Sequence, residues 1–292
     1  MSDVFSIFVH GFWPGFVDKT DANHITFFEN IFSRTKIRNY TITNDIHKAN
    51  VLFESVFAKS VVPVKSWKYK IHYSGEPFVG NPTDYDVVLF SHESQANIVD
   101  LPLFVYYIHG NNYMDALLHR PVITSVPTKF CCFIVSNGSC HIRNQMFQML
   151  NQYKKVDSYG AFQNNMGGKL PLSYWTPEFR AFIRQYKFII CFENSCQGTY
   201  STEKIVNPYL AGIIPIYWSS PHIHSFFSPD SMLFLDTAAG DSHQQLIDRV
   251  IALDTSDTDY LEFVNRPIVV DSAYWNDHYT VDAIANKLDR LL

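Results

Sequence analysis

The segment from residue 186 to residue 221 constrains the fold more than any other part of this sequence. A short apolar run at 188–192 leads into a polar loop, a capped helix can begin at Ser201 or Thr202, and a second apolar run occupies 213–218. This order predicts a strand, a loop, a helix and a second strand, which is a βαβ unit. In open α/β sheets, ligands bind in the crevice at the carboxyl ends of the strands. The loop before the predicted helix is therefore the first candidate for a site.

Lys204 lies in the first turn of that predicted helix. The amino terminus of a helix carries free N–H groups and the positive end of the helix dipole, so it suits a phosphate and ordinarily favours an acidic side chain over a basic one. The position of Lys204 therefore predicts an anion nearby. The alternative interpretation is an ordinary solvated surface lysine.

Three short motifs in this segment resemble a known family. The sequences CFENS, TEK and IPIYWSSP, which follow one another between Cys191 and Pro221, resemble the donor-binding motif of the α1,3/α1,4-fucosyltransferases, enzymes that use GDP-fucose. WPGF near the amino terminus, YSGEP at 73–77 and KFCCFIVSNGSCHIRN at 129–144 are similar to further segments of that family, in the same order. The resemblance implies an α/β fold of two Rossmann-like domains facing across a cleft, the glycosyltransferase-B type. It fades after about Pro221.

Chain length and local pattern also suggest two α/β domains. At 292 residues the chain exceeds the usual size of a single core. Residues 101–118 fit neither a helix nor a strand clearly. The predicted elements are strands at 6–10, near Tyr40, at 51–53, 69–73 and 87–90 with a helix at 23–33 in the first half, and a strand at 130–136 with a helix at 139–153 in the second half.

We place the domain boundary in a proline-containing connection at 119–129. Residues 1–125 are expected to form the domain on the acceptor side, and residues 126–292 the domain that binds GDP-fucose. The final sequence VDAIANKLDRLL has its apolar residues on one helical face, so it is predicted to be an amphipathic helix that closes the second domain.

The resemblance assigns five residues to the donor GDP-fucose: Arg143, Asn194, Tyr200, Glu203 and Lys204. Arg143 and Lys204 would face the diphosphate, because a guanidinium fork binds phosphate oxygens in pairs and two cations opposite two phosphates can replace a metal ion. Without the resemblance, Arg143 would be a helix-surface salt bridge, Asn194 a loop cap, Tyr200 a partly buried aromatic residue, and Glu203 an acid favoured by the helix dipole. Each of these alternatives can be tested by the position of the side chain.

Two further features of the donor motif are less specific. Glu193, in the same motif, has no assigned donor contact and can be structural. The loop from Cys196 to Thr199 departs from the pattern of the family, so the resemblance does not assign donor contacts to it.

Glu76 is the predicted general base. It lies in the turn Ser74-Gly75-Glu76-Pro77, and the resemblance places the matching acid opposite the acceptor hydroxyl. Direct displacement at the anomeric carbon of fucose requires a base on the incoming alcohol, while the charge that builds up on the leaving diphosphate requires cations. The resemblance implies that Glu203 contacts hydroxyls of the donor, and we count Glu203 with Glu76 among the predicted catalytic residues. A single displacement predicts inversion.

No metal ion, and no cofactor besides the donor substrate, is expected. The acidic pair Asp84 and Asp86 has the spacing of a metal-binding DxD motif, but it lies in the first half beside Pro82 and is interpreted as a turn. The five cysteines contain no CxxC pair, and we interpret them as small buried apolar residues.

Charge and hydropathy exclude several classes of partner. The net charge of −5 without a Lys/Arg cluster argues against nucleic acid or an anionic membrane. No apolar run approaches the length of a transmembrane helix, and the first residues lack the basic leader and apolar core of a signal peptide. The chain is therefore expected to be cytoplasmic. The oligomeric state has no signature in the sequence.

Together these features predict an inverting fucosyltransferase that moves L-fucose from GDP-fucose to an oligosaccharide acceptor, at O3 of a GlcNAc-type sugar. One alternative is a related transferase that uses another GDP-sugar, and a second is a lectin-like glycan-binding protein that has lost turnover. The joint presence of Glu76, Arg143, Glu203 and Lys204 disfavours the second alternative. The acceptor itself has no signature in the motifs.

Overall fold

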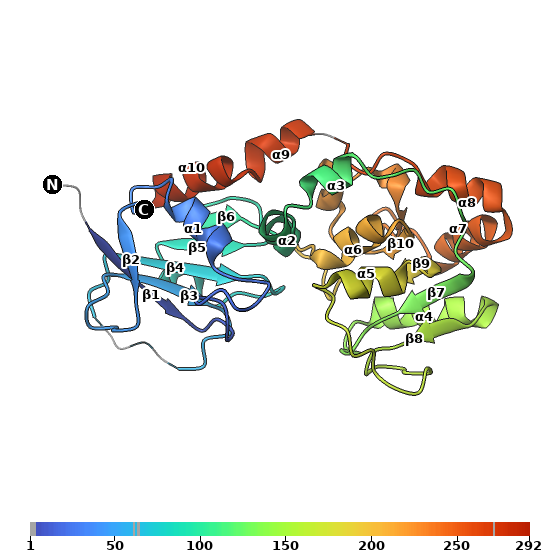
Figure 1. Ribbon diagram of the computed structural model, residues 1–292, viewed down its shortest axis with the longest axis horizontal. Helices are drawn as coiled ribbons and strands as arrows, with labels where there is room; N and C mark the ends of the chain where they lie inside the picture. Colours follow the sequence, from blue (N-terminus) through green and yellow to red (C-terminus); the bar gives the residue numbers. More distant parts are fainter. Residues whose placement is uncertain (1–3, 61, 63–64, 271) are drawn as a thin grey trace. The chain divides into compact units, whose positions relative to one another are not determined.

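The computed structural model describes residues 4–60, 62, 65–270 and 272–292 (Figure 1). By its internal contacts the chain divides into two compact units. The first unit consists of Met1–Asn112, Gln197–Tyr200 and Ser272–Leu292, and the second consists of Tyr113–Cys196 and Ser201–Asp271. Each unit is an α/β structure with its own parallel sheet.

The first unit is built on a six-stranded parallel sheet with the strand order β2-β1-β3-β4-β5-β6. All the strands predicted in this half are confirmed, and the three-residue β6 is an addition, because so short a strand leaves no periodic signal. Its middle strands β3 and β5 are almost fully buried, as parallel strands usually are. The strands are β1 (Phe5–His10), β2 (Tyr40–Thr43), β3 (Val51–Ser55), β4 (Tyr69–Ser74), β5 (Val87–Phe90) and β6 (Ile98–Asp100).

The ambiguous segment 101–118 forms two helices. Most of α2 is buried, and its side chains are apolar on nearly all sides, so the sequence shows no amphipathic period there. The acidic pair Asp84 and Asp86 lies at the end of a 3-10 turn, as predicted. The helices of the first unit are α1 (Thr26–Phe32), η1 (Pro82–Asp84), α2 (Leu103–Asn111), α9 (Ser272–His278) and α10 (Val281–Leu291), whereas α3 (Met114–Leu118) belongs to the second unit.

The carboxyl-terminal amphipathic helix is confirmed as α10, but it packs in the first unit and not in the second (Figure 1). It contacts α1 and β6, and the Arg34 Nε and Asp282 Oδ1 atoms form an ion pair of 2.7 Å. Its buried face includes Ile284 and Leu288. The expected division into 1–125 and 126–292 therefore differs from the observed units, because an apolar helix face specifies burial but not the core that buries it.

The second unit contains a five-stranded parallel sheet with the order β11-β10-β9-β7-β8. The predicted strands and the helix at 139–153 are confirmed, whereas β8, β11, α5, α7 and α8 are additions. Its strands are β7 (Lys129–Phe133), β8 (Val156–Ser158), β9 (Tyr186–Ile190), β10 (Ile214–Tyr217) and β11 (Leu233–Phe234). Its further helices are α4 (His141–Tyr153), α5 (Pro177–Ile183), α6 (Glu203–Ala211), η2 (Pro221–Ser225), η3 (Pro229–Ser231), α7 (His243–Thr255) and α8 (Asp257–Val264).

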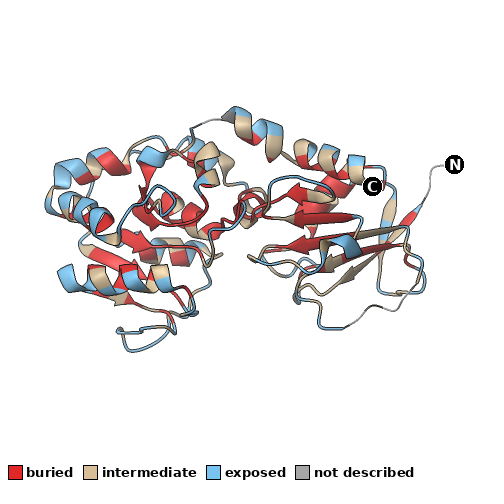
Figure 2. Ribbon diagram, turned by 180° about the vertical axis from the view of Figure 1, so that it is seen from behind, coloured by how far each residue is buried: buried red, intermediate tan, exposed pale blue. Residues whose placement is uncertain are grey.

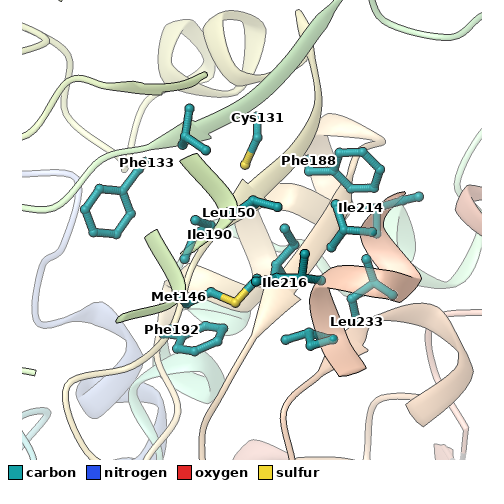
Figure 3. Close-up of a cluster of buried hydrophobic side chains, with 14 of the residues drawn as sticks. Cys131, Phe133, Met146, Leu150, Phe188, Ile190, Phe192, Ile214, Ile216 and Leu233 are labelled. Atoms are coloured by element: carbon teal, nitrogen blue, oxygen red, sulfur yellow. The ribbon is translucent and has the colours of Figure 1, made fainter. Parts of the chain in front are cut away.

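Apolar side chains from this sheet and from α4 form the core of the second unit (Figure 3). Phe133, Phe188 and Ile216 come from three neighbouring strands, and Met146 comes from α4. Burying one such side chain contributes about 1.5–3 kcal/mol. Buried residues are concentrated in the central strands of each unit (Figure 2), so the polar strand ends have a rigid support.

Cysteine burial follows the prediction at four positions and departs from it at one. Cys131, Cys132, Cys140 and Cys191 are buried thiols, but Cys196 is exposed. Cys196 lies in the polar loop after β9, and its immediate sequence neighbours are polar.

Within the described residues, none of the helices combines the length and the apolar character that a bilayer crossing requires.

Candidate active site

The βαβ unit predicted from the sequence is present as β9, α6 and β10. β9 and β10 pair in parallel, with Phe188 opposite Ile214. Thr202 is the residue that caps α6, and its hydroxyl accepts a hydrogen bond from the Lys204 N–H at 3.4 Å. Gly212 ends the helix in the left-handed conformation, with φ of 73°. These local signals place the amino terminus of α6 beside the carboxyl ends of the strands.

Arg143 is a buried residue at the start of α4, with 1% of its surface exposed. Its guanidinium donates to the Phe192 carbonyl at 3.2 Å, to Asn194 Oδ1 at 2.7 Å and to the Asn137 carbonyl at 2.6 Å. A surface salt bridge, the alternative interpretation from the sequence, is therefore wrong. Arg143 joins the loop after β7 to the loop after β9 and holds the side chain of Asn194.

Glu193 is the centre of a buried hydrogen-bond network, and 0% of its surface is exposed. Its Oε1 atom accepts from the Thr202 N–H at 2.7 Å and from the Tyr217 hydroxyl at 2.8 Å. The Thr202 hydroxyl lies 2.9 Å from both carboxylate oxygens, and Lys204 Nζ donates to Oε2 at 3.2 Å. A buried carboxylate needs such partners to offset the loss of water. Glu193 therefore has the structural role that the sequence left open.

Lys204 is not a solvated surface lysine. Only 27% of its side chain is exposed, and its Nζ lies 3.2 Å from Glu193 Oε2 and 3.8 Å from Glu203 Oε1. The Thr202 hydroxyl also accepts from Lys204 Nζ at 3.0 Å. An anion was predicted beside this lysine, and in the structure the nearby anions are two carboxyl groups of the chain itself. A role on a diphosphate stays a prediction.

Glu203 occupies the first position of α6 and is 6% exposed. Burial raises the pKa of its carboxyl group, the Lys204 ammonium opposes this shift, and the charge of Glu193 adds to it. Glu203 is thus a buried acid with a raised pKa at a helix amino terminus. Groups of this kind are often found at functional sites.

The predicted site residues fall into both units. Arg143, Asn194, Glu203 and Lys204 belong to the second unit, where Arg143 bonds Asn194 and the two α6 residues are sequence neighbours. Their common position is the end of β9 and the start of α6. Glu76 and Tyr200 belong to the first unit and are described with it.

Glu76 lies in the predicted turn after β4 and is half-buried. Its backbone N–H donates to Ser74 Oγ at 3.2 Å, and the Ser74 hydroxyl donates to the Phe78 carbonyl at 2.6 Å. This turn fixes the backbone on both sides of the Glu76 carboxylate.

Tyr200 is buried. The alternative interpretation from the sequence, a partly buried aromatic residue, therefore underestimated its burial.

The first unit also contains a buried acid that the sequence pattern did not indicate. Asp100 ends β6, where its carboxylate accepts from the Tyr279 hydroxyl at 2.8 Å and from the Thr199 hydroxyl. Burial raises the pKa of Asp100 to about 6, although the hydrogen bonds from Thr199 and Tyr279 act in the opposite direction. The sequence signal for Asp100 is its position at the carboxyl end of a strand. That strand, β6, has three residues, so its pattern is too short to be recognised in the sequence. Thr199 belongs to the loop that departs from the family pattern.

A metal site requires several His, Cys, Asp or Glu side chains grouped around one point. Over residues 4–60, 62, 65–270 and 272–292, no three His, Cys, Asp or Glu side chains are grouped so that they could hold a metal ion.

A family model described as "Glycosyltransferase family 10 (fucosyltransferase) C-term" matches residues 125–290, more than half of the chain. The chain belongs to glycosyltransferase family 10. The match covers Arg143 and the whole β9–α6–β10 unit, so the residues assigned from the motif lie in the family domain. Glu76 lies outside it.

Individual relatives of this family 10 chain agree with that assignment. A putative fucosyltransferase of Acanthamoeba polyphaga mimivirus is 26% identical over 265 residues, which is 88% of this chain and 41% of the relative. The alpha-(1,3)-fucosyltransferase of Helicobacter pylori is 34% identical over 135 residues, which is 46% of this chain and 27% of that protein. The chain spans less than half the length of these relatives.

The fold is also shared with a solved structure. The crystal structure of an α1,3-fucosyltransferase with GDP-fucose matches with a TM-score of 0.72 at 21% identity, covering 100% of this chain and 91% of that one. This likeness confirms the glycosyltransferase-B type fold with Rossmann-like sheets that the sequence predicted.

Proposed function

We propose that this family 10 protein transfers L-fucose from GDP-fucose to a hydroxyl group of an oligosaccharide, with inversion at the anomeric carbon. The observation that carries the proposal is the pair of contacts among the motif residues of the second unit. The Arg143 guanidinium donates to Asn194 Oδ1 in the loop after β9, and Lys204 Nζ lies 3.8 Å from Glu203 Oε1 in the first turn of α6. A guanidinium and an ammonium in the first turns of two helices suit a diphosphate.

In the proposed reaction Glu76 is the base. Its carboxylate takes the proton of the acceptor hydroxyl, the acceptor oxygen forms a bond to the anomeric carbon, and the bond from that carbon to the β-phosphate oxygen breaks. The electron pair leaves with GDP, whose negative charge is stabilised by Arg143, Lys204 and the N–H groups of α6. One displacement converts the β-linked donor into an α-fucoside.

Donor recognition in the second unit would combine phosphate and hydroxyl contacts. We assign Asn194 and Glu203 to the donor, with Glu203 on its hydroxyls, since Arg143 holds Asn194 in the loop after β9 and Glu203 begins α6. The resemblance also assigns Tyr200 of the first unit to the donor, and it places the acceptor on the side of Glu76. The proposed acceptor position is O3 of a GlcNAc-type sugar.

The proposal is tested by incubating the protein with GDP-fucose, with and without a panel of glycans, and measuring the release of GDP. We expect release to depend on a GlcNAc-containing acceptor, and NMR of the product to show an α1,3-linked fucose. GDP-mannose in place of GDP-fucose serves as the control for a different GDP-sugar. Turnover with GDP-mannose alone would identify another transferase, and glycan binding without turnover would identify a glycan-binding protein.

A further inference from the structure

The ammonium of Lys204 lies between two buried carboxyl groups. It is 3.2 Å from Oε2 of Glu193, which is within hydrogen-bond distance, and 3.8 Å from Oε1 of Glu203, which is beyond it. The Glu193 and Glu203 side chains are 0% and 7% exposed. The Lys204 ammonium therefore interacts with two buried carboxyl groups. Its distance from each carboxyl group decides how strongly it stabilises the negative charge of that group.

Glu193 is held in place independently of Lys204. The Thr202 N–H, the Thr202 hydroxyl and the Tyr217 hydroxyl all donate to its carboxylate. Tyr217 comes from β10, while Glu193 follows β9, and a backbone hydrogen bond of 2.9 Å from the Glu193 N–H to the Trp218 carbonyl fixes the main chain. The carboxylate of Glu193 is thus a rigid anchor for the ammonium.

We infer that Glu193 is a positioning residue that holds the Lys204 ammonium away from Glu203 and thereby controls whether Glu203 carries a charge. The inference rests on the proposed function in one respect, namely that Glu203 faces the donor. An ionised Glu203 only accepts hydrogen bonds from sugar hydroxyls, whereas a protonated Glu203 also donates one. Glu193 would set the pH below which donor recognition by Glu203 fails.

The charges around Glu203 support this role. Burial raises the pKa of the Glu203 carboxyl group, Lys204 lowers it, and Glu193 raises it again. If the Glu193 charge is removed, its repulsion of the Glu203 carboxylate is lost, and the Lys204 ammonium loses the charge that attracts it away from Glu203. Both effects favour the ionised form of Glu203.

Helices α3 and α5 also pack against α6, and their charged groups are engaged elsewhere or exposed. Asp115 of α3 pairs with His119 at 2.8 Å, and the Arg180 guanidinium of α5 lies over the Tyr113 ring at 5.0 Å. Glu178 of α5 is exposed. Lys204 and Glu193 are therefore the charged residues to substitute in a test of what controls the charge of Glu203.

The test is a ¹³C NMR titration of the Glu203 carboxyl group in the unliganded protein, with Glu203→Gln used to assign the signal. In Glu193→Gln we expect the titration midpoint of Glu203 to fall. In Lys204→Met we expect it to rise. Opposite shifts are the signature of a shared charge, because a general loss of packing would expose Glu203 in both variants and lower both midpoints. An unchanged midpoint in Glu193→Gln, or shifts of the same sign in both variants, would overturn the inference.

A charge-balanced variant keeps the test decisive if Glu193→Gln does not fold. Replacing a buried ion pair by neutral side chains is often tolerated, so the combination of Glu193→Gln with Lys204→Met should fold. We expect its Glu203 midpoint to lie below that of Lys204→Met alone, because the repulsion from Glu193 is gone. Equal midpoints in the two proteins would also overturn the inference.

Activity gives an independent readout. In Glu193→Gln the acid limb of the kcat/KM profile should move to lower pH together with the NMR midpoint, and an acid limb that stays in place would show that Glu203 does not limit the reaction and would remove Glu193 from this role. If the parent protein binds no GDP, the proposed transferase function fails, while the NMR titrations still decide the role of Glu193.

Discussion

Lys204 and Glu193 form an ion pair whose acidic member is completely buried. Removing one member of such a pair leaves the other charge without compensation, and this costs more than the pair contributes as a unit. Lys204 therefore differs from a lysine on an exposed helix face. Its contribution to the fold can be measured separately from any contribution to ligand binding.

We expect Lys204→Ala to lower the free energy of unfolding of the second unit by about 2 kcal/mol, a value below the usual cost for a fully buried pair because Lys204 is partly exposed. Denaturant unfolding followed by circular dichroism measures this loss. Lys155→Ala, at a lysine whose side chain is 62% exposed, is the control and should change little. Equal stability of the Lys204→Ala and Lys155→Ala proteins would show that Lys204 contributes no more to the fold than an exposed lysine.

Glu76→Gln should reduce kcat by about a hundredfold to ten-thousandfold, the usual range for the loss of a general base, and leave the Kd for GDP unchanged. The amide keeps the turn with Ser74, because that turn uses the backbone N–H and not the side chain of Glu76. Glu93→Gln, at an exposed acid of the same unit, is the matched control. Turnover equal to that of the parent would remove Glu76 from the mechanism.

At the scale of elements, one buried carboxylate, that of Asp100 in β6, joins three segments. The other two are the loop 197–200 and the segment around Tyr279. Asp100 accepts hydrogen bonds from Thr199 and Tyr279, which come from distant parts of the chain. Gly198 has φ of 55°, and a Cβ atom there would lie 2.6 Å from the Ser91 carbonyl oxygen. The loop inside the family motif is thus held by backbone geometry and by one acid.

This acid gives the first unit a defined pH dependence. The pKa of Asp100 is raised from 3.8 to about 6, so the folded state binds its proton more tightly than the unfolded state. Its stabilising contribution is complete below about pH 4 and is lost as the pH rises through about 6, a loss of about 3 kcal/mol. Asp100→Asn should remove this decline when unfolding is measured from pH 4 to pH 7.5. A parallel pH dependence in the two proteins would contradict the prediction.

For the molecule as a whole, the chain forms most of the first unit, then the second, contributes residues 197–200 to the first unit on the way, and ends in the first unit with α9 and α10. Leu288 is completely buried on α10. Leu288→Ala should destabilise the first unit by about 2–5 kcal/mol, the usual cost of such a cavity, and leave the second unit unaffected. Calorimetry that resolves two transitions would show which one moves. A shift confined to the GDP-responsive transition would contradict the observed division.

GDP should stabilise the second unit in the absence of acceptor. A ligand at about a hundred times its Kd adds about 2.7 kcal/mol, which raises Tm by roughly 5 to 10 degrees in a domain of this size. Guanosine, which lacks phosphate, should produce a much smaller shift, because the predicted contacts of Arg143 and Lys204 are to phosphate. Equal shifts with GDP and guanosine would contradict the assignment of these residues to the diphosphate.

The β9–α6–β10 unit was predictable because its signals are local. Apolar runs, the Thr202 cap and the glycine that ends α6 lie within one short segment, and each acts on its immediate neighbours. The same reasoning predicted α10 as an amphipathic helix. The family motif added a predicted donor-binding role for the residues at the start of α6. Hydrophobic periodicity alone would have predicted only that they are polar.

Partners that are distant in the chain were not predictable in this way. α10 carries an apolar face, but hydrophobic burial has no direction, so the sequence could not indicate that this face belongs to the first unit. The contacts of Asp100 with Thr199 and Tyr279 span 99 and 179 residues. Likewise Glu193 has a clear role only after the fold brings Tyr217 and Lys204 to its carboxylate. Local sequence determines where helices and strands begin and end, whereas buried charges find their partners through the packing of whole elements.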